Sequence, residues 1–255
     1  MPVVPDKLDR LIENFKISET NFCFILHGPP GTGKSHRIRK SLKNENTHFF
    51  KGRLTAPALF QTLQEYSEDH YIVFSGVDGV FDSKSLEIIK AVTDDEGGER
   101  KVSWATKRGK SEFVFNGKII ILTNQDYAGP HWKAISSRSE CFRYELTEEK
   151  FITTAMKIAK NGMIDLAKEV AQEMIDHHML DLRKFRIFYE TACNNQEDWR
   201  SLIQHHFEVN DDHDGQVASI KNSKNSGMRD NQLRDEFTKR TGLSASTYYR
   251  RKRCA

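Results

Sequence analysis

Short apolar runs alternate with helical patterns over the first half of the chain. Five runs have the length and composition of buried strands, at residues 21–26, 47–50, 71–74, 118–123 and 141–146. Apolar residues at helical spacing occupy four other segments, at 7–15, 36–42, 57–66 and 85–92. Strands that alternate with helices favour a parallel sheet covered on both faces. The pattern therefore predicts an α/β fold with a five-stranded parallel sheet.

The rest of the chain is divided by changes in this pattern. Alternating residues at 101–105 and 112–115 predict a β-hairpin before the fourth strand. Residues 147–206 have a helical pattern with a break at Asn161-Gly162, and 210–227 are polar and rich in glycine and asparagine. We therefore expect an α/β core over 1–146, a helical part over 147–208, a linker over 209–227 and a small basic helical segment over 228–255.

The clearest candidate chemistry lies between the first strand and the helix that follows it. The run there is Gly28, Pro29, Pro30, Gly31, Thr32, Gly33, Lys34 and Ser35. Glycines let the backbone approach phosphate oxygens, and the amide groups at the start of the helix face the anion. The run predicts a site for ATP and Mg²⁺, in which Lys34 reaches the β- and γ-phosphates and Ser35 ligates the metal. The expected nucleotide contacts extend to His36.

This loop and the polar residues after it resemble the AAA+ ATPase family over about the first 200 residues. The resemblance makes Asn124, at the end of the fourth strand, the sensor 1 residue that hydrogen-bonds the attacking water or the γ-phosphate. Arg183 corresponds to sensor 2, with Arg186 as the alternative. The helical part then becomes the family's α-helical lid over the nucleotide.

The same resemblance implies an arginine finger before the fifth strand. Arg138 takes that position, with Arg143 as the alternative. An arginine finger stabilises charge during phosphoryl transfer in a neighbouring subunit. The resemblance therefore implies a homo-oligomer, expected to be a hexameric ring with ATP between subunits.

The third strand departs from the family pattern at its end. Where the family has two adjacent acids, this chain has Ser75 and Gly76, followed by Asp78. Ser35, Ser75 and Asp78 are the expected metal-site residues, and loss of a positioned base costs about 10²–10⁴-fold in rate. We expect weak hydrolysis, unless Asp78 or one of the acids Asp94, Asp95 and Glu96 replaces the pair. The substitution can be natural or engineered.

Positive charge is concentrated at the C-terminal end. The chain has a net charge of +3, whereas residues 219–255 contain ten basic and three acidic residues, so the remainder carries −4. This segment resembles a helix-turn-helix, and its expected DNA contacts are Ser246, Thr247, Tyr248, Arg250, Arg251 and Arg253. The alternative is a basic tail that docks on an acidic protein surface.

The composition and the apolar pattern indicate where in the cell the protein is expected, and the motifs indicate its expected function. No apolar run is long enough to span a membrane, and the N-terminus lacks the features of a signal peptide. Four separated cysteines indicate free thiols in a cytoplasmic protein. The favoured function is an AAA+ ATPase that acts on DNA by remodelling it, unwinding it or loading another protein onto it. The alternatives are a non-hydrolysing assembly switch on DNA and a protein-directed AAA+ chaperone.

Overall fold

The computed structural model describes residues 6–52, 54–68, 70–76, 82–95, 98–106, 109–124, 129–159, 163–207 and 234–235. The chain divides into two compact units. One comprises Met1–Thr154 with Leu180–Arg183, and the other comprises Ala155–Met179 with Lys184–Ala255.

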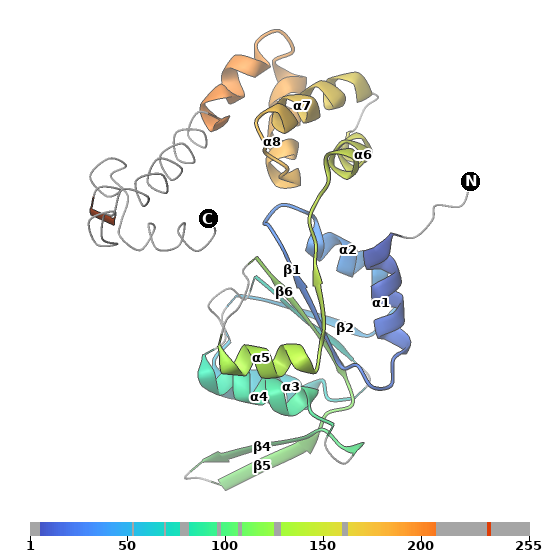
Figure 1. Cartoon of the computed structure of the whole chain (residues 1–255), viewed down its shortest axis with the longest axis vertical. Helices are drawn as coiled ribbons and strands as arrows, with labels where there is room; N and C mark the ends of the chain where they lie inside the picture. Colours follow the sequence, from blue (N-terminus) through green and yellow to red (C-terminus); the bar gives the residue numbers. More distant parts are fainter. Residues whose placement is uncertain are drawn as a thin grey trace, which may run out of the picture. The chain divides into compact units, whose positions relative to one another are not determined.

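A parallel sheet forms the centre of the first unit, with its strands in the order β2-β3-β6-β1-β7 (Figure 1). The strands are β1 (Cys23–His27), β2 (Thr47–Lys51), β3 (Tyr71–Ser75), β6 (Lys118–Thr123) and β7 (Glu140–Arg143). All neighbouring pairs are parallel, and Ile120 of the central strand lies opposite both Phe24 and Val73. The predicted α/β fold with five parallel strands is confirmed. The fifth strand ends at Arg143, three residues earlier than its apolar pattern indicated.

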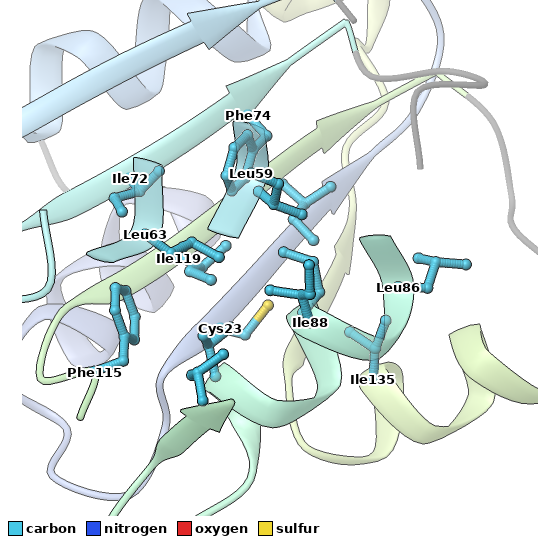
Figure 2. Packing of buried hydrophobic residues seen from close by; sticks show 14 of the residues in the cluster. Cys23, Leu59, Leu63, Ile72, Phe74, Leu86, Ile88, Phe115, Ile119 and Ile135 are labelled. Atoms are coloured by element: carbon cyan, nitrogen blue, oxygen red, sulfur yellow. The ribbon is translucent and has the colours of Figure 1, made fainter. Parts of the chain in front are cut away.

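Alternating side chains on these strands form a separate apolar layer on each face of the sheet. On one face, Phe24, Val73 and Ile120 pack with α1 (Lys7–Ile17) and α2 (Lys34–Ser41). On the other face, Ile72, Phe74 and other apolar side chains pack with α3 (Ala56–Glu65), α4 (Ser83–Thr93) and α5 (Pro130–Ser137). Figure 2 shows the second layer, in which Cys23 and Ile119 lie among side chains from these helices. This two-sided burial explains the continuous apolar runs in the sequence.

The apolar pattern gives no indication of α5. Only Trp132 and Ile135 of this helix are buried, which is too few to produce a clear helical period. Pro130 occupies its first turn, where a missing backbone N–H costs no hydrogen bond. The segment before the fifth strand is therefore largely helical, and Arg138 is the C-cap of the helix.

An antiparallel hairpin of β4 (Lys101–Thr106) and β5 (Gly109–Val114) confirms the predicted hairpin. Its aromatic side chains are tied to α3, because the Phe60 ring lies 5.1 Å from the Phe113 ring and 6.0 Å from the Trp104 ring. At the base of the hairpin, the buried Arg100 donates to the Gly117 carbonyl at 2.7 Å. Burial lowers the pKa of Arg100 to about 10.

Helices make up the described part of the second unit, apart from the residues that join them. They are the end of α6 (Glu148–Ile158), α7 (Ile164–Asp176), most of α8 (Leu182–Asn194) and a helix over 199–207. Their buried residues include Met174, Phe188 and Trp199. Among the described residues, no helix combines the length and apolarity needed to cross a bilayer. The predicted linker and basic segment lie outside the described residues, apart from Arg234 and Asp235.

Candidate nucleotide site

Glycines shape the phosphate loop, which joins β1 to α2. Gly28, Gly31 and Gly33 have φ values of +148°, +75° and +88°, a region that side chains with a Cβ rarely adopt. Gly28 also lies so close to Tyr144, the residue after β7, that a Cβ there would lie 2.1 Å from the Tyr144 carbonyl oxygen. The loop is closed by a 3.0 Å hydrogen bond from the Thr32 hydroxyl to the Pro29 carbonyl. Its conformation therefore requires these residue types.

Lys34 is the first residue of α2, directly after the loop, and is 93% buried. Its ammonium donates to the carbonyls of Gly28 and Pro29, both at 2.7 Å, and to Asn124 Oδ1 at 3.1 Å. Asn124 immediately follows β6, the strand beside β1. The structure thus brings together the lysine and the candidate sensor 1 residue, which are 90 positions apart in the sequence.

Two hydroxyl groups meet at the start of α2. Ser35 Oγ lies 3.1 Å from Ser75 Oγ at the end of β3. Both are candidate metal-site residues, and both offer a hydroxyl oxygen of the kind that Mg²⁺ sites use. Asp78, the third candidate, lies outside the described residues. In the described part of the chain, no group of three or more His, Cys, Asp or Glu side chains forms a metal site.

Gly76 follows Ser75 in an unusual backbone conformation. Its φ is +70°, and a Cβ added to it would meet nothing within 4 Å. There is space for a side chain, but the left-handed conformation costs an ordinary residue about 1–2 kcal/mol. Among the alternative acids, Glu96 lies outside the described residues, and Asp94 pairs with Arg138 at 2.9 Å. Asp95 is exposed.

The segment Leu180–Arg183 contacts the phosphate loop, within the first unit. The Leu182 amide donates to the Gly31 carbonyl at 2.9 Å, and a Cβ on Gly31 would lie 2.1 Å from the Asp181 carboxylate carbon. Asp181 also caps the start of α8, since its Oδ1 accepts from the Arg183 amide at 2.7 Å. Sequence reasoning assigned no role to Asp181. Its residue type at a helix start was the only available signal.

The candidate arginines have different surroundings. The Arg138 guanidinium pairs with Asp94 and donates to the Ala134 carbonyl at 3.1 Å. Arg143, its alternative, is exposed and pairs with Glu145 at 2.6 Å. Arg183 is exposed although its backbone adjoins the contact with Gly31, and Arg186 and His36 are also exposed. The predicted DNA contacts, from Ser246 to Arg253, lie outside the described residues.

The residues present fit a bound nucleotide. The loop offers backbone amides at a helix N-terminus and the hydroxyl of Ser35. It also offers the buried ammonium of Lys34, whose hydrogen bonds to three oxygen atoms show that this position suits oxygen acceptors such as those of phosphate. The left-handed glycines keep the loop open to close approach by phosphate oxygens. With the parallel sheet, this loop defines a P-loop α/β domain.

Comparison with solved structures gives the same fold. The RuvB Holliday junction branch migration motor of Thermotoga maritima matches at 14% identity and a TM-score of 0.50. The match covers 75% of this chain and 63% of the RuvB chain. Two RuvB variants from that organism match at 14% identity, with TM-scores of 0.59 and 0.57. They cover 94% and 93% of this chain, and 82% and 80% of their own. Neither protein-family models nor curated proteins gave a match to the sequence.

Proposed function

We propose that this chain is an AAA+ protein that binds ATP and Mg²⁺ and acts on DNA as an oligomer, with slow hydrolysis. The observation that carries the proposal is the contact of Lys34 with the phosphate loop and Asn124. This contact brings together the two residues that correspond to the phosphate-binding lysine and the sensor 1 residue of the AAA+ family. The RuvB structures, which include a DNA branch migration motor, share the fold of this chain and support the choice of DNA.

The residues have separable roles in this proposal. Lys34 and the amides of Gly31, Thr32 and Gly33 hold the phosphates, while Ser35 with Ser75 holds the metal and its waters. When bound, Mg²⁺ neutralises charge on the β- and γ-phosphates. Asn124 orients a water beside the γ-phosphate, and Arg183 turns from solvent toward the phosphates. Ser75 and Gly76 supply no carboxylate to accept a proton, and slow hydrolysis follows.

A second candidate, an ATP-dependent assembly switch that does not hydrolyse ATP, is favoured by the same two residues. The distinguishing experiment measures ATP turnover with and without DNA, together with the mass of the protein with and without ATP. DNA-stimulated turnover supports the motor, and assembly with ATP but without turnover establishes the switch. Absence of ATP binding would contradict both.

Arg138 gives a direct test of the oligomer. We expect Arg138→Ala to preserve ATP binding and to lower turnover by about 10³-fold or more, as when an arginine finger is lost. Arg143→Ala is the matched control, because this arginine is also exposed and ion-paired nearby. A larger loss from Arg143→Ala would assign the finger to Arg143. Equal turnover in both variants and the unmodified protein would contradict a shared site.

The proposed DNA contacts of the C-terminal segment are tested separately. Deletion of residues 219–255 removes a net charge of +7 and the residues Ser246, Thr247, Tyr248, Arg250, Arg251 and Arg253. We expect DNA affinity to fall at every salt concentration, because these cations neutralise phosphates. Unchanged DNA affinity would instead favour a protein-directed role for the segment.

A further inference from the structure

Four cations lie along the outer side of α2 and the end of β2: Arg39, Lys40, Lys43 and Lys51, here called the α2 basic surface. We propose that the α2 basic surface binds the phosphodiester backbone of DNA. The inference rests on the proposed function for the identity of the partner. The location of the contact is new, because it lies in the α/β core and is separate from the C-terminal segment.

The four side chains come from neighbouring parts of the structure. Arg39 and Lys40 lie in the last turn of α2, Lys43 follows the end of this helix, Lys51 ends β2, and all four residues are exposed. The Arg39 guanidinium lies 3.7 Å from the centre of the Phe49 ring on β2. Phe49 and Lys51 point to the same side of this strand, because successive strand residues alternate. Arg39 therefore connects the helical part of the surface with its strand part.

The pairing of these cations differs from that of many other basic residues. Lys16, Arg37, Lys101, Arg138 and Lys150 each lie within 4 Å of an acidic side chain. Arg39, Lys40, Lys43 and Lys51 make no ion pair within the described ranges of the chain. The nearest acid in sequence, Glu45, is already 3.0 Å from Lys16. The surface therefore keeps its positive charge available to a partner.

Charge is also distributed unevenly around the surface. Residues 36–52 contain five basic residues and one acid, a net charge of +4, within the first 218 residues that carry −4 in total. The other 201 of these residues therefore carry −8. A local positive surface on an acidic body attracts a polyanion to one place and repels it elsewhere. This charge distribution favours the DNA backbone over an apolar or cationic partner.

The size of the surface fits several phosphates. Lys51 is paired in register with Ser75, whose hydroxyl meets Ser35 at the start of α2, whereas Lys43 follows the end of that helix. The surface thus extends along α2, whose eight residues span about 12 Å. A DNA strand presents one phosphate per about 3.4 Å of helix axis, so about three phosphates face this length.

The helix dipole explains only part of the arrangement. Cations in the last turn of a helix stabilise it by about 0.3–1 kcal/mol, which accounts for Arg39 and Lys40. It does not account for Lys51, which lies at the opposite end of α2 on a different element. Because α2 also begins with Lys34 and Ser35, the same helix would contact ATP at its start and DNA along its side.

The test compares the salt dependence of DNA binding in the full chain. Fluorescence anisotropy of a labelled duplex is measured over a series of salt concentrations for the unmodified protein and for the variant Arg39→Gln, Lys40→Gln, Lys43→Gln. We expect weaker binding by the variant. The slope of log affinity against log salt should become shallower by about 0.9 for each phosphate that the variant no longer neutralises, or about 2–3 for three phosphates.

The matched control removes three cations elsewhere in the core, Lys84→Gln, Lys90→Gln, Lys133→Gln, and should leave the slope near its original value. Thermal unfolding confirms that both variants fold. Equal slopes for the unmodified protein and the Arg39, Lys40, Lys43 variant, with DNA binding intact, would overturn the α2 basic surface alone. An equal loss in the control variant would also overturn it. Absence of DNA binding by the unmodified chain would overturn the proposed function itself.

Discussion

The ends of β1 and β3 lie at the same edge of the sheet, but they present different numbers of polar and charged groups. After β1, the loop has left-handed glycines, a buried Lys34 with three acceptors, and Ser35 at the start of α2. At the end of β3, Ser75 contributes a hydroxyl, and Gly76, the last described residue before 82, has no side chain. Under the proposed function, this comparison separates nucleotide binding from hydrolysis. The groups proposed to hold phosphates are present after β1, whereas Ser75 and Gly76 supply no carboxylate to activate water at the end of β3.

The largest effect is expected from removing charge after β1. Lys34→Met keeps the length of the side chain but removes an ammonium that lies inside the loop. Loss of one partner of a buried, hydrogen-bonded charge costs about 2–5 kcal/mol, so we expect ATP affinity to fall by about 30-fold or more. Calorimetric titration measures this change, and Lys84→Met, at an exposed residue of α4, is the control. Equal ATP affinity in the Lys34 variant would contradict a phosphate-binding loop.

The complementary change adds a carboxylate at the end of β3. We expect Ser75→Asp, alone or with Gly76→Glu, to raise ATP turnover by about 10²-fold or more, the effect of a positioned base. Ser75→Asn controls for side-chain size without charge. Because Gly76 has φ +70°, Gly76→Glu also strains the backbone, and the single variant is therefore measured first. If neither variant hydrolyses ATP faster, these positions do not limit turnover.

A smaller change concerns the carboxylate that contacts the loop after β1. Asp181 lies against Gly31, where its negative charge would oppose nucleotide phosphates. Asp181→Asn keeps a good helix cap but removes the charge, and we expect ATP affinity to rise by about threefold to tenfold. Titration with a fluorescent ATP analogue measures it. Asp181→Ala removes both charge and cap, so it should show the same tighter binding with lower stability. Unchanged affinity in both variants would show that the carboxylate does not oppose phosphates.

The smallest effect concerns the support of α2. Arg37 contacts Asp6 at 2.8 Å and Asp9 at 2.5 Å, and so ties α2 to the start of α1. Burial alone would raise the pKa of Asp6, but the Asp9 amide and Arg37 lower it below its ordinary value. This stabilisation is present above the ordinary pKa of about 4 and is lost as pH falls through the lowered value.

We therefore expect Asp6→Asn to lower the free energy of unfolding by about 0.5–1 kcal/mol near pH 7 and by less near pH 3. Urea unfolding at both pH values measures the difference, with Asp165→Asn, at an exposed residue of α7, as the control. A difference that grew on acidification would contradict the assigned pKa shift.

The two faces of the sheet illustrate what sequence patterns predict well. Continuous apolar runs such as 118–123 require burial on both sides, and Ile119 and Ile120 do contact different layers. The glycine-rich loop between β1 and α2 was equally predictable, because its residues, Gly28 to Ser35, form one continuous run in the sequence. Helix α5 was missed because only two of its side chains are buried. Its absence from the expected elements left the segment before the fifth strand without an assigned structure, whereas Arg138 caps a helix there.

The sequence by itself determined the parallel α/β fold and the phosphate loop, since both depend on local periodicity and on consecutive residues. Only the tertiary structure brought Asn124 to Lys34, Ser75 to Ser35 and Asp181 to Gly31, because these contacts join positions far apart in the chain. The α2 basic surface likewise became apparent only when the ion pairs of Lys16 and Arg37 were known. Charge in a sequence gives the number of cations, whereas folding decides which of them acidic neighbours neutralise.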